Sequence, residues 1–166
     1  ALLRQGDTIA DRYEIEGILG QGGMGIVLEA LDRGTRTRVA IKLLQPGGSA
    51  IEGGTERFLR EARASSSLTG EHVARVLDTG TLPNGVPFMV MERLVGHDLR
   101  VELHQRGKLP VAEAASRLLE ACDALAEAHG RGIVHRDLKP ANMFLAERPD
   151  GSRVLKVLDK RLRVVS

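Results

Sequence analysis

The segment HRDLKPAN, from His135 to Asn142, brings three kinds of reactive side chain into one short stretch. The carboxylate of Asp137 can accept the proton of an attacking hydroxyl, and the ammonium of Lys139 can neutralise a phosphoryl group in transfer. The carboxamide of Asn142 offers an oxygen of the kind that binds magnesium. These residue types at this spacing indicate phosphoryl transfer, whereas His135 taken alone is also consistent with a packed histidine.

A second feature could bind phosphates. The segment GQGGMGIV, which ends at Val27, fits the pattern G-x-G-x-x-G-x-V and lies between two strand-like stretches. Its glycines Gly20, Gly22 and Gly25 let backbone amides approach phosphate oxygens and adopt positive φ freely. The pattern alone is not specific, because most glycine-rich turns bind nothing. A strand rather than a helix follows it, which argues against a dinucleotide-binding fold.

Lys42 and Glu61 form a third candidate feature. A lysine on a strand is usually a solvated surface charge. If the strand covers a nucleotide, however, Lys42 can hold its phosphates, while Glu61 on the next helix fixes the lysine rotamer. The sequence therefore allows both roles for Lys42, and its context favours the second.

The elements that must position these residues follow from hydrophobic periodicity. Strands are predicted over 12–19, 25–32 and 37–44, and two more are predicted within 72–94 around a turn at 83–85. In the third strand, one face receives Val39, Ile41 and Leu43, and the other receives Ala40 and Lys42.

The predicted helices differ between the two halves of the chain. Thr55 is the expected N-cap of one helix in the first half. In the second half, an Ala-rich helix after Pro110 ends at Gly130 and carries Leu118, Cys122 and Leu125 at helical spacing, so we expect it to be buried through them.

Composition bounds the remaining possibilities. A chain of 166 residues can form one domain or two small lobes, and its net charge of +2 is too small to indicate nucleic-acid binding. A single cysteine excludes an intramolecular disulfide and any multi-cysteine metal site. No stretch is apolar enough to span a bilayer, so we expect a cytoplasmic chain without a membrane segment, although the parent protein could still be anchored.

In this order, the motifs GQGGMGIV, AIK and HRDLKPAN resemble the amino-terminal part of a eukaryotic-like serine/threonine protein kinase of the type found in bacteria. The similarity runs from about Thr8 to Asp159. It implies an α+β, protein-kinase-like fold of two lobes. The N-lobe, at 8–91, would have a five-stranded antiparallel sheet and one helix. A hinge would follow at 92–98, and an incomplete, mainly helical C-lobe at 99–166.

The resemblance also implies a role for each matching residue, with ATP and Mg²⁺ as the bound species. ATP would be contacted by Gly20, Gly22, Gly25, Val27, Ala40, the gatekeeper Met91, the backbone of Glu92 and Leu94, Asp98 at the ribose, and Phe144. The phosphates would be bound by Lys42, paired with Glu61. Catalysis would use Asp137 as base and Lys139 as phosphate cation, and magnesium would be held by Asn142 and Asp159.

The chain departs from the family immediately after Asp159, where Lys160 and Arg161 replace the expected Phe and Gly. A lysine in the phenylalanine position would bury an ammonium group unless it turned outward, and loss of the glycine removes backbone freedom. Asp159 then need not point at a metal. A reading-frame change or interrupted gene after Asp159 and a genuine short pseudokinase would both explain this. Without the later helices of the family, we also expect marginal stability, or association through Leu118, Cys122 and Leu125.

Two functions therefore stay open. The first is an ATP-dependent protein kinase that phosphorylates serine or threonine hydroxyls of a protein substrate, with this chain expected to be inactive by itself. The second is a pseudokinase-like module that binds ATP or another protein without catalysis. An unrelated nucleotide-binding protein that uses only the glycine-rich loop would not account for HRDLKPAN.

Overall fold

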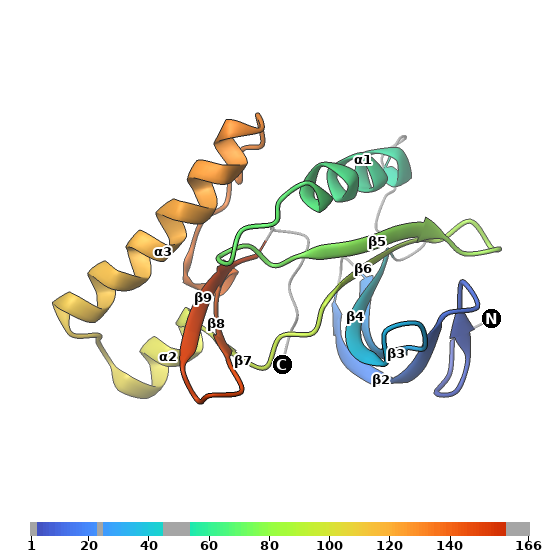
Figure 1. Ribbon diagram of the computed structural model, residues 1–166, viewed down its shortest axis with the longest axis horizontal. Coiled ribbons are helices and arrows are strands. Elements are labelled where there is room, and N and C mark those ends of the chain that lie inside the picture. The colour runs from blue at the N-terminus through green and yellow to red at the C-terminus, as the bar shows by residue number, and fades with distance from the viewer. Residues whose placement is uncertain (1–2, 23–24, 45–53, 159–166) are drawn as a thin grey trace. The chain divides into compact units, whose positions relative to one another are not determined.

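The structure, a computed structural model, describes residues 3–22, 25–44 and 54–158 (Figure 1). The chain divides into two compact units. The first holds the described residues up to Ser67 together with Arg75–Arg93, and the second holds Leu68–Ala74 and the described residues from Leu94 onward. The segment 68–74, which the prediction counted in the first lobe, thus belongs to the second unit. The assignment of lobes and hinge as functional regions stays a prediction.

The first unit is built on a six-stranded antiparallel sheet with the strand order β1-β2-β3-β4-β6-β5. Its strands are β1 (Thr8–Ile9), β2 (Tyr13–Gly22), β3 (Gly25–Asp32), β4 (Thr37–Leu44), β5 (Val76–Thr81) and β6 (Pro87–Glu92). The predicted antiparallel sheet is confirmed, but it has six strands rather than five. The added strand, β1, is joined to β2 through Ala10 and Asp11, whose φ angles are 51° and 54°. No glycine marks this left-handed turn in the sequence, so the pattern gave no signal for it.

The alternation of side chains along β4 separates two faces of this sheet. Val39, Ile41 and Leu43 belong to the hydrophobic core, which also includes Leu28 and Val90 from the neighbouring strands. Lys42 and Ala40 fall on the opposite face, as predicted from period two.

The helix α1 (Gly54–Ser66) packs beside β5 and β6 in the same unit. Its buried residues Phe58 and Ala62 are four positions apart, which places both on one side of the helix. The helix begins at Gly54, so Thr55 lies within its first turn, and the prediction of Thr55 as N-cap was wrong.

The second unit combines helices with a small sheet. Its helices are α2 (Leu99–Arg106), α3 (Val111–Gly130) and the 3₁₀ turn η1 (Pro140–Asn142), and its antiparallel sheet β7-β8-β9 consists of Gly96–Asp98, Met143–Glu147 and Arg153–Val157. The sequence analysis expected a mainly helical region and did not include this sheet. Its strands are too short for a clear alternation of apolar and polar residues, although Pro149 and Gly151 lie in the turn between β8 and β9.

The buried side of α3 is made of small residues. Ala121, Ala124 and Ala128 pack in the core of the second unit. By contrast, Leu118 is 56% exposed and Cys122 is exposed, so the prediction that these two residues are buried was wrong. Alanines let the helix lie close to its neighbours, and their weak hydrophobic signal hides this side in the sequence.

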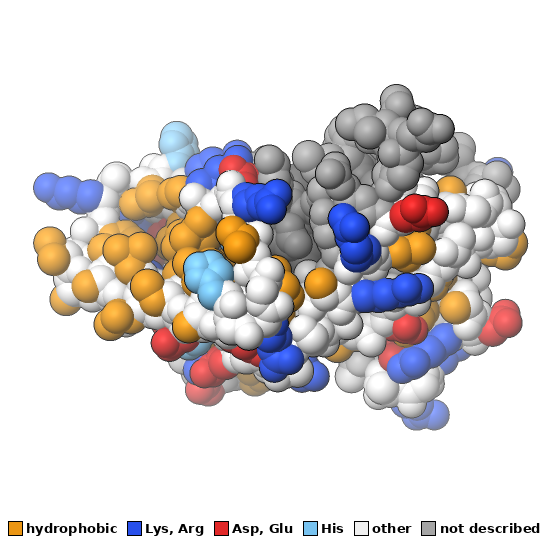
Figure 2. All heavy atoms as spheres, turned by 90° about the horizontal axis from the view of Figure 1, so that it is seen from above, with side chains coloured by type: hydrophobic (Ala, Val, Ile, Leu, Met, Phe, Trp, Pro, Cys, Tyr) orange, Lys and Arg blue, Asp and Glu red, His pale blue; other side chains and the backbone are white. Residues whose placement is uncertain are grey.

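The outer side of α3 carries exposed apolar side chains. Val111, Leu118 and Leu119 are all more than half exposed, and Figure 2 shows hydrophobic side chains gathered on the surface of the second unit. Association through this surface stays a prediction. Within the described part of the chain, no helix has both the length and the apolar character needed to cross a membrane.

Gly96 is required where β7 meets β8. Its φ is +132°, and a Cβ atom at this position would lie 2.0 Å from the backbone oxygen of Leu145. We therefore expect Gly96→Ala to lower the free energy of unfolding by about 2 kcal/mol or more, through backbone strain and a clash with main-chain atoms. Urea unfolding followed by circular dichroism measures this change.

The matched control is Gly130→Ala in the same unit, because a Cβ atom there meets nothing within 4 Å. This control should be neutral or slightly stabilising. Equal unfolding midpoints for the two variants would contradict the stated role of Gly96.

Candidate functional site

Lys42 is held in the middle of the first unit's sheet. On β4 it pairs in register with Val27 of β3 and Met89 of β6, and it is only 4% exposed. The same face carries Ala40, which is fully buried and pairs with Met91. A buried ammonium group on an otherwise apolar surface is suited to an anion that brings its own apolar part.

The glycine-rich segment forms the end of the β2–β3 hairpin. Gly20 pairs with Val27, and Gly22 pairs with Gly25, while residues 23 and 24 lie outside the described part of the chain. The φ of Gly25 is 139°, a conformation that side-chain-bearing residues rarely adopt. The predicted glycine loop is therefore a strand hairpin, with Lys42 on the strand next to it.

The end of β6 carries two further candidates. Met91 is buried, and the backbone N–H of Glu92 donates to the Arg75 carbonyl at 3.0 Å. The side chain of Glu92 accepts from the Arg75 N–H at 2.8 Å, so Glu92 joins β6 to the residue before β5. Glu61 lies in α1, but its side chain is outside the described part, so the proposed pairing with Lys42 is untested.

In the second unit, the HRDLKPAN segment forms a loop centred on Asp137. Asn142 Nδ2 donates to the Asp137 backbone oxygen at 2.7 Å and to its Oδ2 at 3.2 Å. Lys139 Nζ lies 3.1 Å from the same Oδ2, and the side chain of Asp137 is 24% exposed. The three residues that the sequence selected thus lie together around one carboxylate that solvent can reach.

His135 supports this loop and does not extend the reactive cluster. The Asp137 backbone N–H donates to His135 Nδ1 at 3.3 Å, and His135 Nε2 lies 2.5 Å from the Leu158 carbonyl oxygen. Because Nδ1 accepts, the proton belongs on Nε2, which then donates to that carbonyl. His135 is therefore packed between the loop and the end of the last strand, which agrees with the structural interpretation of this residue.

Asn142 is the best candidate for a metal ligand among the described residues. It is fully buried, and its Oδ1 atom has no hydrogen-bond partner within the described part of the chain. Buried polar atoms are rarely left unpaired, and an amide oxygen is a normal magnesium ligand. The other predicted ligand, Asp159, lies outside the described residues. Among the residues that the structure describes, no group of three or more His, Cys, Asp or Glu side chains could hold a metal ion. The donor that is described therefore fits magnesium.

Asp98 and Phe144 lie opposite each other on β7 and β8. Asp98 is the N-cap of α2, because its Oδ1 accepts from the Val101 N–H at 3.0 Å, and its Oδ2 lies 3.4 Å from Arg100 Nη2. Phe144 is 2% exposed and packs in one cluster with Leu94. The predicted ribose ligand thus has a structural role in addition to the one assigned from the resemblance.

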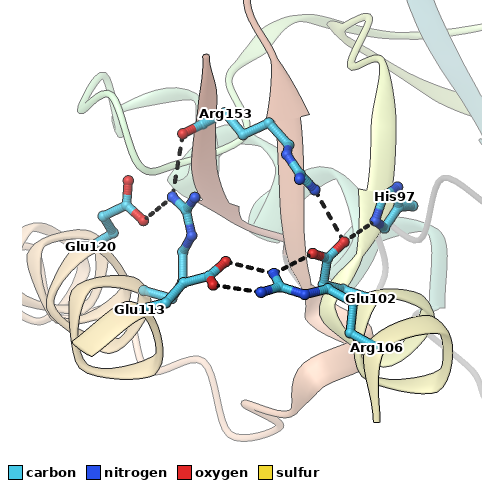
Figure 3. Close-up of polar contacts among 7 residues, drawn as sticks. His97, Glu102, Arg106, Glu113, Glu120 and Arg153 are labelled. Carbon is cyan, nitrogen blue, oxygen red and sulfur yellow. Dashed lines mark hydrogen bonds and ion pairs between the residues drawn. The ribbon is translucent and has the colours of Figure 1, made fainter. Parts of the chain in front are cut away.

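A network of charged side chains surrounds the start of α2, and sequence reasoning missed it (Figure 3). Glu102, whose side chain is 3% exposed, lies 2.5 Å from His97 Nε2, 2.9 Å from Arg106 Nη1 and 3.0 Å from Arg153 Nη1. Arg106 also binds both carboxylate oxygens of Glu113 at 2.8 Å. The hydrogen bonds from Arg106 and His97 lower the pKa of Glu102 to about 2. Only the i,i+4 spacing of Glu102 and Arg106 was visible in the sequence.

The sheet with its buried lysine and the Asp137 loop together define an α+β architecture of the protein kinase type. The family profile described as protein kinase domain matches residues 13–160. The chain therefore belongs to the protein kinase domain family.

Curated relatives are bacterial serine/threonine kinases. The chain is 40% identical over 141 residues to the probable serine/threonine-protein kinase PknB of Corynebacterium glutamicum, covering 83% of this chain and 22% of that protein. It is 36% identical over 154 residues to the serine/threonine-protein kinase pkn3 of Myxococcus xanthus, covering 93% of this chain and 28% of that protein. The chain thus spans roughly a quarter of the length of these relatives.

A solved structure gives the same result for the fold. The crystal structure of the Mycobacterium tuberculosis PknI kinase domain superimposes with a TM-score of 0.83 at 30% identity, covering 98% of this chain and 64% of that one. The protein-kinase-like fold predicted from the sequence is thereby confirmed.

The depressed pKa of Glu102 makes a prediction about acid stability. The ordinary pKa of this carboxyl group is 4.5, and its pKa in the folded chain is about 2. The ionised carboxylate therefore stabilises the fold fully above pH 4.5, and this stabilisation is lost as the pH falls toward 2. We expect Glu102→Gln to lower the free energy of unfolding at pH 7 by about 3 kcal/mol, since His97, Arg106 and Arg153 all lose this buried carboxylate. The variant should also show a shallower loss of stability between pH 4.5 and 2.

The control for this experiment is Glu147→Gln, which changes an exposed carboxylate at the end of β8. Denaturant unfolding at several pH values measures both variants and the unchanged chain. Parallel pH profiles for Glu102→Gln and the unchanged chain would contradict the assigned role of this carboxylate.

Proposed function

We propose that this chain is the nucleotide-binding and catalytic-loop part of a serine/threonine protein kinase, which transfers the γ-phosphoryl group of ATP to a hydroxyl of a protein substrate. The observation that carries the proposal is the arrangement around Asp137. Its carboxylate is held by Asn142 Nδ2 and lies 3.1 Å from Lys139 Nζ, while solvent still reaches it. Both curated relatives described above are named as serine/threonine kinases, which supports the choice of acceptor.

In this proposal Asp137 orients the acceptor hydroxyl and accepts its proton. Lys139, whose side chain is 44% exposed, can follow the transferred phosphoryl group and offset its charge. Asn142 has two functions, because its Nδ2 fixes Asp137 and its Oδ1 would hold magnesium together with Asp159. When bound, magnesium would neutralise charge on the ATP phosphates.

Each unit contains residues that the resemblance assigns to ATP. In the first, Val27, Ala40 and Met91 lie on one face of the sheet and would give adenine apolar contacts, and Lys42 on the same face would bind the α- and β-phosphates. Amides of Gly20, Gly22 and Gly25 would cover the phosphates, Glu61 would pair with Lys42, and the backbone of Glu92 would meet adenine. In the second, the corresponding residues are Leu94, Asp98 and Phe144.

The proposal includes a cytoplasmic setting, supported by the single cysteine, which is compatible with a reducing compartment. It includes no nucleic-acid partner, since the net charge is only +2.

A second candidate function is a module that binds ATP or a protein without catalysis. It is favoured by Lys160 and Arg161, which replace the Phe and Gly of the family beside the predicted magnesium ligand. We propose that residues 1–166 by themselves bind the nucleotide but transfer little phosphate. The exposed apolar side of α3 would supply the protein-binding surface of such a module.

Nucleotide binding is tested first on the chain itself. ATP with magnesium should raise its melting temperature by about 5 °C at saturating concentration, because a ligand that binds only the folded state stabilises it. Lys42→Met should abolish this shift, since it removes the cation and keeps the volume of a long side chain. Lys108→Met, at an exposed position, is the matched control. The same shift in both variants would exclude phosphate binding by Lys42.

Catalysis is tested in a chimaera that joins residues 1–158 to the remaining part of the related PknI kinase domain. We expect transfer of labelled γ-phosphate to a serine or threonine peptide, and at least about 100-fold less transfer for Asp137→Asn. Asp150→Asn, on the exposed turn between β8 and β9, should leave the rate unchanged. A chimaera that folds and binds ATP without transfer would favour the non-catalytic function.

A further inference from the structure

The start of α2 has an unusual side-chain pair on either side of its N-cap. His97 directly precedes the cap residue Asp98, and Glu102 lies in the first turn of the helix. Apolar residues commonly meet at these two positions and fix the direction in which the chain enters the helix. Here a hydrogen bond of 2.5 Å joins His97 Nε2 to Glu102 Oε2, and Glu102 is 2% exposed.

The position of Glu102 is set by other elements of the second unit. Arg153 reaches it from β9, and Arg106 binds it from the last turn of α2 (Figure 3). Arg106 is in turn held by Glu113 in the first turn of α3. Because His97 is bonded to Glu102, its position depends on α2, α3 and β9 in addition to its own strand, β7.

This constraint fixes the direction of Asp98. Its Oδ1 is used in the cap, and its side chain is only 17% exposed, so the orientation of its Oδ2 depends on the corner between β7 and α2. Gly96 and His97 pair with Ala146 and Leu145 of β8, which fixes one side of this corner. The bond between His97 and Glu102 fixes the other side. A carboxylate must be held within roughly 0.5 Å to bind a pair of hydroxyls well.

We propose that His97 and Glu102 are positioning residues for Asp98, and that they give the nucleotide site its preference for a ribose with free hydroxyl groups. This inference rests on the proposed function, because it takes ATP as the ligand and Asp98 as the ribose contact. It goes further in assigning the discrimination between ATP and deoxynucleotides to a side-chain pair that contacts no part of the nucleotide.

The test compares the dissociation constants of ATP and 2′,3′-dideoxy-ATP, both with magnesium, measured by calorimetry on residues 1–166. We expect the unchanged chain to bind ATP about tenfold more tightly than 2′,3′-dideoxy-ATP, because the dideoxynucleotide loses a hydrogen bond to a charged group. The ratio of the two dissociation constants is the selectivity. Asp98→Ala should bring this ratio close to one. Glu102→Gln should reduce it severalfold, while ATP still binds.

Two substitutions of His97 separate positioning from stability. His97→Leu places an apolar residue where one is commonly found and leaves Glu102 with Arg106 and Arg153, so the chain should stay folded and lose the discrimination. His97→Gln keeps an N–H donor and should retain most of the discrimination between ATP and dideoxy-ATP. Circular dichroism melting of each variant confirms that it is folded, and His97→Leu decides the result if Glu102→Gln does not fold.

Each outcome has one meaning. The inference is overturned if His97→Leu keeps the ratio of the unchanged chain. It is also overturned if the unchanged chain binds ATP and dideoxy-ATP equally well. Both results leave the proposed function intact. Failure of the unchanged chain to bind ATP overturns both. A ratio that falls in His97→Leu and is retained in His97→Gln supports the inference, since a merely structural role would change the melting temperature and not the selectivity.

Discussion

The arrangement of the Asp137 loop in the second unit depends on the side chain of Asn142, which is fully buried. Its Nδ2 atom donates to the backbone and to the carboxylate of Asp137, so the amide decides where that carboxylate points. Its main chain is also engaged, because its N–H donates to Lys139 and its carbonyl oxygen accepts from Leu158, each at 2.8 Å. A buried donor or acceptor left unpaired costs about 1–3 kcal/mol, so displacing this loop would break several such bonds together. These hydrogen bonds therefore hold the loop in the conformation described above.

The first unit presents its reactive group in a different way. Lys42 needs no loop, because the pairing of β4 with β3 and β6 fixes its backbone on both sides. The same pairing fixes where the side chain of Lys42 leaves the sheet. The proposed phosphate contact therefore uses a cation whose backbone is already held in place.

Sequence reasoning succeeded where local spacing carries the information. Period two placed Lys42 and Ala40 on one face, and the order of the side chains in HRDLKPAN predicted the cluster at Asp137. It failed where small or distant residues decide the structure. The buried side of α3 is made of alanines, whose hydrophobic pattern is much weaker than that of leucines would be. Glu102 contacts Arg153, which lies 51 positions later in the sequence. Such a pairing depends on the completed fold, so no local pattern could reveal it.

The network at α2 shows why a polar pair can be better than an apolar one at such a place. Two apolar residues flanking the cap would pack in several nearly equivalent ways, because dispersion contacts have little directional preference. A histidine and a carboxylate meet through one N–H and one oxygen, so only one arrangement satisfies both. Compared with an apolar residue of similar size, a buried Glu102 adds little net stability once its desolvation is counted, although removing its charge alone is costly. The pair instead fixes one geometry for the corner between β7 and α2. This corner carries Asp98, the carboxylate that the proposed nucleotide site needs in a fixed position.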